Sequence, residues 1–166
     1  MAFKEISTRE LQINPFSAIG DEWMLVAAGT PEKFNMMTAS WGSVGEMWSK
    51  PVAVTVIRPQ RYTDQFIKEN DYFTLSFYGD DKQIHKVCGS KSGRDVDKVK
   101  ETGLVPVFDN GSVYFEQARL VLVCKKIFSQ TMDPAGIIDQ SIDKWYPDKD
   151  YHNVYVGEIV KVLVKE

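Results

Sequence analysis

A β-type segment near the C-terminus, residues 154–164, places the strongest constraint on the fold. Apolar side chains fill both sets of its alternate positions: Val154, Val156, Val160, Val162 and Val164 in one set, and Tyr155, Ile159 and Leu163 in the other. Successive side chains of a strand point to opposite faces, so both faces of this strand should be at least partly covered. A sheet with one face in water does not offer this environment. We therefore expect a closed or sandwiched sheet.

Shorter strands are predicted along the rest of the chain, separated by turn signals. The β-compatible runs are residues 23–28, 34–41, 52–57, 73–78, 113–115 and 118–128. The turn at 29–31 joins the first two runs into a hairpin, Pro59 ends the third, and Asn110-Gly111 is a tight turn. Helical patterns are fewer, at 63–70, 82–87 and 95–102, the last with Asp95 as its N-cap and Gly103 at its end. This pattern predicts a mainly β fold with a few peripheral helices and disfavours a doubly wound parallel sheet.

Length and charge exclude several classes of protein. The chain has 166 residues, enough for one hydrophobic core, so residues 1–166 are expected to form one domain. Its net charge of -3 gives no field that gathers nucleic acid or anionic lipid, so neither is expected as a partner. Cys88 and Cys124 lack metal-ligand spacing, so neither a metal site nor a disulfide scaffold is expected. Without a signal peptide or an apolar run near the ~20 residues of a membrane helix, a cytoplasmic protein is expected.

The segment Ser90-Lys91-Ser92-Gly93-Arg94-Asp95 is the first candidate for a binding site. It brings two hydroxyls, two cations and a glycine together immediately before a predicted helix. Phosphate esters are bound by charged donors, short hydroxyls and backbone N–H groups at a helix start, and glycine lets the backbone approach closely. The segment therefore suits an anion. A solvated loop that caps a helix is the alternative interpretation.

A second candidate lies where a predicted strand ends and a helix begins. It contains Arg58, Arg61, Tyr62 and Thr63. An arginine guanidinium is a rigid fork for phosphate, and Thr63 is placed either to cap the helix or to contact the same oxygens. The two clusters are suited to hold one phosphate from either side. An ordinary strand-to-helix turn with exposed arginines is equally consistent with this pattern.

Residues 35–42 form an unusual strand, because Asn35, Thr38 and Ser40 interrupt its apolar positions. Polar groups in a buried strand need hydrogen-bond partners. A flat ring system with carbonyls and ring nitrogens would supply such partners, and Trp41 would cover its face or edge. A solvated outer face of the sheet is the alternative interpretation.

Candidate catalytic groups are few. His152 lies just ahead of the last strand, after an irregular region, and we expect it near a bound substrate or cofactor, although a lone histidine also serves as a surface or packing residue. His85, in a short charged helix, is not assigned to the site. The chain lacks G-x-G-x-x-G, G-x-x-x-x-G-K-[ST], H-E-x-x-H and G-x-S-x-G. Since no nucleophile has an obvious base beside it, any chemistry is expected to belong to a bound cofactor.

Three motifs in series resemble the flavin reductase-like family, in particular its flavoredoxin-like branch. They are Asn35-Met36-Met37-Thr38-Ala39-Ser40-Trp41, Arg58-Pro59-x-Arg61-Tyr62-Thr63 and Cys88-Gly89-Ser90-x-Ser92-Gly93-Arg94-Asp95-x-Asp97-Lys98. The segment His152-x-x-Tyr155-Val156-Gly157-Glu158-Ile159-Val160 resembles the closing strand of that family. The resemblance runs from near Trp23 to the C-terminus.

The resemblance implies an FMN-binding split β-barrel that forms a homodimer and binds FMN near the subunit interface. The residues that it places at the isoalloxazine ring or the ribityl chain are Asn35, Thr38, Ala39, Ser40 and Trp41. Those that it places around the phosphate are Arg58, Arg61, Thr63, Ser90, Lys91, Ser92 and Arg94, and Tyr62 and Gly93 belong to the same two motifs. These implied contacts join the two anion clusters into one site.

The activity implied by the resemblance is NAD(P)H-dependent flavin reduction. A hydride passes from NADH or NADPH, bound transiently, to the flavin, and electrons go on to free flavin, a metal complex or another acceptor. One alternative is a carrier that holds FMN tightly without significant NAD(P)H turnover. Another is a flavin-free split-barrel interaction module, against which the anion cluster at 90–94 argues.

Overall fold

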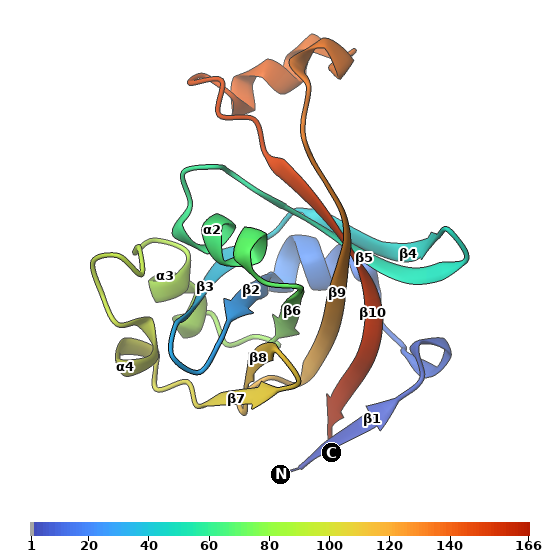
Figure 1. The fold of residues 1–166 in the computed structure, drawn as a ribbon, viewed down its shortest axis with the longest axis vertical. Coiled ribbons are helices and arrows are strands. Elements are labelled where there is room, and N and C mark those ends of the chain that lie inside the picture. Colours follow the sequence, from blue (N-terminus) through green and yellow to red (C-terminus); the bar gives the residue numbers. More distant parts are fainter. Residues whose placement is uncertain (1) are drawn as a thin grey trace.

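Strands dominate the computed structural model, which describes residues 2–166 (Figure 1). The strands are β1 (Phe3–Ile6), β2 (Met24–Gly29), β3 (Phe34–Ala39), β4 (Gly42–Met47), β5 (Lys50–Ile57), β6 (Tyr72–Phe77), β7 (Pro106–Asp109), β8 (Ser112–Phe115), β9 (Leu120–Thr131) and β10 (Asn153–Lys165). The helices are α1 (Pro15–Ser17), α2 (Tyr62–Glu69), α3 (Gln83–Cys88) and α4 (Lys98–Thr102), and the 3₁₀ or π segments are η1 (Thr8–Glu10), η2 (Ala18–Glu22), η3 (Pro134–Gly136) and η4 (Gln140–Trp145). The prediction of a mainly β fold with few helices is confirmed. Within the described residues, no helix is both long and apolar enough to cross a membrane.

One large antiparallel sheet forms the body of the molecule. Its strand order is β3-β2-β6-β9-β10-β5-β4, and β1 also pairs with β10. The end strands of this path, β3 and β4, are joined by only Ser40 and Trp41, and β3 also contacts β5. The sheet therefore curls until its two ends approach each other. The separate β7–β8 hairpin turns at Asn110 and Gly111, both with positive φ, as the sequence predicts.

Both faces of the sheet are covered, as the last strand predicts. Alternate residues of β2 and β9 belong to two different hydrophobic clusters. The first contains Met24, Val26, Leu120 and Leu122 together with Phe66 and Ile67 of α2. The second contains Leu25, Ala27, Val121 and Val123 together with Ile84 and Cys88 of α3. Each large apolar side chain buried in this way contributes about 1.5–3 kcal/mol of transfer free energy.

The predicted alternation of faces along β10 is wrong beyond Ile159. The register of β10 against β9 shifts between Ile159 and Lys161, and Val160 is left exposed at this irregularity. Val162 therefore packs in the same cluster as Tyr155 and Ile159, while Leu163 packs in the other cluster. An extra residue in one strand reverses the facing of every residue after it, and a strict period of two does not reveal it.

Two predicted boundaries also change. Asp97, not Asp95, is the N-cap of α4, because its side chain accepts a hydrogen bond from the Lys100 N–H at 3.1 Å. The Asp95 N–H instead bonds the Ser92 carbonyl in a turn, so residues 89–97 connect α3 to α4. Gly103 ends α4 with a φ of +72°, as predicted. The strand expected over 34–41 ends at Ala39, and the hairpin of β4 with β5 follows.

The segment between β9 and β10 projects from the barrel and carries η3 and η4 (Figure 1). Asp133 and Asp139 cap these two 3₁₀ helices through their carboxylates. Arg58, at the end of β5, fastens the segment to the barrel, since its guanidinium donates to Asp150 and to the Trp145 carbonyl, each at 2.8 Å. The projecting segment therefore returns to β5 just before β10 begins.

Candidate functional site

Two neighbouring cavities lie along β3 and share Met37, Thr38 and Arg61 as lining residues. The first, of about 290 Å³, is bounded by β3, the start of α2 and the loop from α3 to α4. The second, of about 390 Å³, is bounded by the end of β3, the end of β5 and the foot of the projecting segment. The shared residues make the two cavities one continuous site region.

Every site residue predicted from the sequence lines one of these cavities. Those at the first cavity are Asn35, Thr38, Arg61, Tyr62, Thr63, Ser90, Lys91, Ser92, Gly93 and Arg94. Those at the second are Thr38, Ala39, Ser40, Trp41, Arg58, Arg61 and His152. The three sequence motifs, distant along the chain, thus lie side by side in the fold.

Asn35 joins β3 to both other walls of the first cavity. Its side chain is buried, and its Nδ2 donates to Thr63 Oγ1 at 3.0 Å. A Cβ at Gly93 would overlap the side-chain amide of Asn35, so only glycine lets the 89–97 loop approach this closely. Strand, helix and loop therefore meet at one contact, which fixes the shape of the cavity.

A buried carboxylate, that of Asp64, fixes the start of α2 through hydrogen bonds. Asp64 accepts hydrogen bonds from Tyr155 Oη at 2.6 Å and from Asn153 Nδ2 at 3.1 Å, and Lys68 pairs with it at 2.8 Å. Burial, together with the adjacent Asp64 carboxylate, raises the pKa of Tyr155, so the phenol remains a donor. The network links α2 to β10 and positions Tyr62 and Thr63 at the cavity.

Four cations line the first cavity, and only one of them has a carboxylate partner within residues 2–166. Lys91 pairs with Glu101 at 2.6 Å. Arg94 donates to the Gln60 carbonyl at 3.2 Å and stacks over Tyr62. Lys98 donates to two carbonyls, and the Arg61 guanidinium makes no hydrogen bond or ion pair with any described residue. These cations outnumber Asp95, the carboxylate in the same lining, and they lie beside the Thr63 and Ser92 hydroxyls, which accept hydrogen bonds, and beside the Ser90 hydroxyl, which donates to the Lys86 carbonyl. The resulting surplus of positive charge suits an anion.

Lys98 is a site residue that the sequence reasoning does not single out. It is 5% exposed, and its Nζ donates to the carbonyls of Met36 at 2.8 Å and Cys88 at 3.2 Å. Burial lowers the pKa of Lys98. Its place at the end of the third motif was the available signal, but a lysine within a charged helix ordinarily points to solvent. Cys88 lines the same cavity as a thiol, because burial raises its pKa to about 11.

The second cavity is aromatic. The Trp41 ring lies 5.3 Å from the Trp145 ring and 5.2 Å from the His152 ring, measured between centroids. His152 Nδ1 forms a 2.7 Å hydrogen bond with Tyr146 Oη. Burial and the neighbouring Arg58 lower the pKa of His152 to about 4, so its imidazole is neutral at pH 7. Sequence reasoning did not identify Trp145, because its segment shows no regular pattern.

Arg58 is placed differently from the other residues expected around a phosphate. It lines the second cavity rather than the first, and its guanidinium is engaged with Asp150 and the Trp145 carbonyl. Its ring-stacking contact with Tyr146, at 5.0 Å, fixes it further. The expectation that Arg58 shares a phosphate with Arg61 is therefore not supported, since the ion pair directs it toward the projecting segment.

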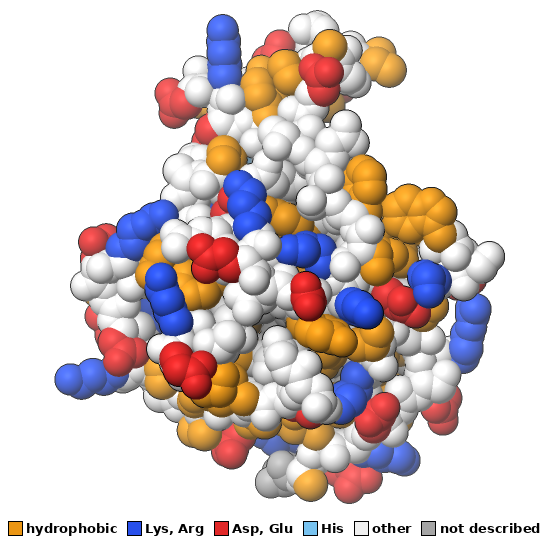
Figure 2. Space-filling view, in the orientation of Figure 1, with side chains coloured by type: hydrophobic (Ala, Val, Ile, Leu, Met, Phe, Trp, Pro, Cys, Tyr) orange, Lys and Arg blue, Asp and Glu red, His pale blue; other side chains and the backbone are white. Residues whose placement is uncertain are grey.

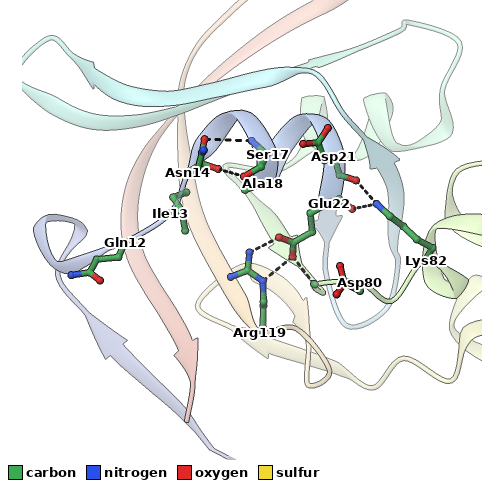
Figure 3. Close-up of a pocket in the computed structure, with 11 residues that line it drawn as sticks. Gln12, Ile13, Asn14, Ser17, Ala18, Asp21, Glu22, Asp80, Lys82 and Arg119 are labelled. Carbon is green, nitrogen blue, oxygen red and sulfur yellow. Dashed lines mark hydrogen bonds and ion pairs between the residues drawn. The ribbon is translucent and has the colours of Figure 1, made fainter.

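A separate cavity of about 420 Å³ beside η2 is charged but internally paired (Figure 3). Glu22 accepts from both the Arg119 guanidinium and the Gly79 N–H, and Lys82 donates to the carbonyls of Asp21 and Glu22. The Arg119 partner offsets the effect of burial and lowers the pKa of Glu22. These groups satisfy one another, so they fasten η2 to α3 and β9 rather than present free charge.

The two cavities along β3 suit a flavin mononucleotide. Cations without a carboxylate partner in the described chain (Arg61, Arg94 and Lys98) and nearby hydroxyls at the first cavity are matched to a phosphate ester. At the second cavity, the indoles of Trp41 and Trp145 pack edge to face and offer an aromatic wall for a flat ring. Gly93 and Gly89 keep the loop wall free of Cβ atoms that would overlap Asn35 and the His85 carbonyl. The residues present therefore fit this cofactor.

Comparison with known proteins agrees with this geometry. Residues 16–166 match the family described as the flavin reductase like domain, and the chain therefore belongs to that family. Among curated proteins, none matches this chain.

Several solved structures share its fold. A flavoredoxin from Methanosarcina acetivorans is similar over 99% of this chain and 77% of its own, with a TM-score of 0.69 and 21% identity. An FMN-binding protein from Thermus thermophilus, solved with bound p-hydroxybenzaldehyde, is similar over 98% of this chain and 82% of its own, with a TM-score of 0.69 and 20% identity. The NADH:FAD oxidoreductase of Streptomyces globisporus C-1027 is similar over 87% of this chain and 74% of its own, with a TM-score of 0.64 and 14% identity, in its complex with NAD and FAD fragments. The mainly β architecture is thus that of the flavin reductase split barrels.

Proposed function

We propose that this chain binds FMN and acts as an NAD(P)H-dependent flavin reductase. The observation that carries the proposal is the position of Arg61, which lines both cavities with a guanidinium that no described residue engages. The planar Arg61 guanidinium lies where the anion-binding cavity meets the aromatic cavity. This position suits a ligand that has both a phosphate and a flat ring. FMN is such a ligand.

The proposed orientation follows from the donor sets. The phosphate lies in the first cavity against Arg61, Thr63, Ser90, Ser92, Lys91 and Arg94, with Tyr62 and Gly93 shaping the wall. The isoalloxazine ring lies along Asn35, Thr38, Ala39 and Ser40 and reaches Trp41. Lys98 adds a buried positive charge beneath the phosphate.

When bound, the flavin supplies the redox chemistry by accepting a hydride from NADH or NADPH. Side chains of this protein bind, orient and exclude water. Trp41 and Trp145 shield the ring from solvent, and His152 lies beside them as a neutral imidazole that can donate or accept one hydrogen bond. Arg58 and Asp150 hold the projecting segment over this end of the site.

The partners and location are proposed with the activity. We propose that the working form is a homodimer and that it acts in the cytoplasm on small molecules: flavin, nicotinamide and an electron acceptor. Cys88 and Cys124 support the location, because both are buried free thiols, as in reducing compartments.

The test is the visible absorbance spectrum of the purified protein with added FMN, followed by anaerobic NADH or NADPH. Shifted flavin bands that bleach on addition of nicotinamide support the reductase. Bands that bleach only with dithionite identify a carrier reduced by another protein, and free-flavin bands alone contradict FMN binding.

Arg61→Gln is expected to weaken FMN binding at least tenfold, since a hydrogen bond to a charged group contributes about 1.5–3 kcal/mol. Arg9→Gln is the control, because Arg9 is exposed, pairs with Glu46 and lines neither cavity.

A further inference from the structure

The Thr38 hydroxyl forms a hydrogen bond with a histidine that is not among the proposed FMN contacts. His85 Nδ1 and Thr38 Oγ1 are 2.8 Å apart. Thr38 is the hydroxyl residue shared by both cavities, whereas His85 is 3% exposed on α3 and lines neither. The imidazole therefore acts on the site only through Thr38.

The contact is rigid on both sides. A Cβ at Gly89 would lie 3.3 Å from the Thr38 Cβ, so the end of α3 packs directly on this residue. Lys82, just ahead of α3, donates to the Asp21 and Glu22 carbonyls (Figure 3). Its Nζ also lies 3.9 Å from the centre of the Trp23 ring. Trp23 in turn packs edge-to-face on His85, with 5.7 Å between ring centroids. These contacts fix α3 and leave the Thr38 hydroxyl little freedom.

His85 is a neutral imidazole. Burial, reinforced by the Lys82 cation, lowers the pKa of His85 to about 4, and the Asp81 and Glu22 carboxylates only partly oppose this. A neutral imidazole has a single N–H, so one ring nitrogen donates and the other accepts. The tautomer therefore decides whether Thr38 turns its hydrogen or its lone pairs toward the cavities.

The surroundings of the second ring nitrogen favour the tautomer with hydrogen on Nδ1. Nε2 is buried without a hydrogen-bond partner among the described residues. Within residues 2–166 the buried hydroxyls of Ser76 and Tyr78 also meet no hydrogen-bond partner, and the Tyr78 and His85 ring centroids are 6.2 Å apart. Burial raises the pKa of Tyr78, so it retains its proton. At such a position, a ring nitrogen that keeps only its lone pair costs less than a buried N–H without an acceptor.

We propose that His85 is a positioning residue whose Nδ1–H donates to Thr38 Oγ1, which directs the Thr38 hydroxyl hydrogen to an acceptor atom of the bound isoalloxazine ring and raises its reduction potential. Most polar atoms on the ring edge are acceptors, and they gain electron density when the flavin is reduced. A donor fixed at this edge therefore stabilises the reduced form more than the oxidised form. The inference rests on the proposed FMN site, but the His85 tautomer is a property of the protein alone.

The first measurement is the ¹⁵N NMR spectrum of histidine-labelled protein without flavin. The chain has two histidines, so the signals that disappear in His85→Gln are those of His85. We expect a neutral imidazole protonated on Nδ1 at pH 7. Protonation on Nε2 would overturn the proposal before any cofactor is added.

The second measurement is the reduction potential of bound FMN in four variants. In His85→Phe, which keeps the ring but removes its donor, the preference for reduced over oxidised FMN should fall about tenfold, or ~30 mV for a two-electron couple. Thr38→Val should give the same shift, and the double variant should add nothing. His85→Gln, whose amide can donate to Thr38, should recover most of the potential. Equal potentials in wild type and His85→Phe would overturn the inference while FMN binding stands, whereas a wild-type protein that binds no FMN would refute the proposed function.

Discussion

Lys98 is an unusual residue because it is a buried cation with no carboxylate partner among residues 2–166. Such a group costs stability on folding, and its position in the lining of the first cavity supports the proposed phosphate site. We expect Lys98→Met to weaken FMN binding about tenfold and to leave the binding of riboflavin, which lacks the phosphate, unchanged. The apoprotein should melt at the same temperature or higher.

Flavin fluorescence titrations with FMN and riboflavin, alongside thermal melting, check this prediction. Lys86→Met is the matched control, because Lys86 is an exposed lysine on α3 that lines neither cavity. Equal loss of FMN and riboflavin affinity would mean that Lys98 shapes the cavity rather than attracts the phosphate.

Sequence reasoning recovers residues whose chemistry is visible in their type and spacing. Ser90, Lys91 and Arg94 stand together in the chain, so their anion-binding character is apparent before the fold is known. Lys98 and His85 are different, because their importance lies in burial and in what they contact. A lysine or histidine in a short polar helix ordinarily faces solvent, and only tertiary packing turns these two side chains inward.

At the scale of elements, the approach of the 89–97 loop to β3 depends on one missing side chain. Gly93→Ala would place a Cβ against the buried Asn35 amide, which is held by Thr63. The loop must then move away from β3 and α2, and the hydroxyls and cations that it carries move with it. We expect at least tenfold weaker FMN binding and a loss of unfolding free energy of about 1–3 kcal/mol.

Isothermal titration with FMN and urea unfolding measure these two effects. Gly45→Ala in β4 is the control, since no atom lies within 4 Å of its added Cβ and its φ is not in the left-handed region. If Gly93→Ala binds FMN as wild type does, the loop does not need its contact with Asn35 to form the site.

The strands that the sequence predicts are determined by their own residues, whereas those that it misses form because of pairing with other strands. The strands β2, β5, β6, β9 and β10 are rich in apolar and β-branched residues, so their type is evident. By contrast, β4 contains Gly42, Gly45 and Glu46 and becomes a strand because β5 pairs with it. The irregularity at Val160 has a similar origin, because it is imposed by pairing with β9 and leaves no local signal.

At the scale of the whole molecule, closure of the sheet brings the site together. The first and last strands of the sheet, β3 and β4, lie next to each other because the sheet curls. Residues 35–41, the end of β5 and the start of β10 therefore meet although they are distant in sequence. The predicted covering of both faces by residues 154–164 indicated a closed or sandwiched sheet, without deciding between the two. Which motif faces which cavity depended on the curvature of the sheet and was not predictable from the strands alone.

The same closure leaves an apolar surface beside the β4–β5 hairpin. Met47 and Trp48 at its tip are 42% and 57% exposed, and Phe128 of β9, 5.9 Å from the Trp48 ring, is 40% exposed. Figure 2 shows apolar side chains gathered over this part of the molecule. Exposed aromatic clusters of this kind are typical of protein interfaces, and a second copy of the chain would cover them in the proposed homodimer.

Sedimentation velocity tests this surface directly. Wild type is expected to sediment with twice the 18.9 kDa mass of the chain. Trp48→Glu should shift the protein toward the single-chain mass, because a buried, unpaired carboxylate is strongly disfavoured at an apolar interface. Phe16→Glu, at an 86% exposed aromatic outside this surface, should leave the mass unchanged. A Trp48→Glu protein that keeps the dimer mass would show that the subunits meet elsewhere. A folded monomer that still binds FMN would show that one chain completes the cofactor site.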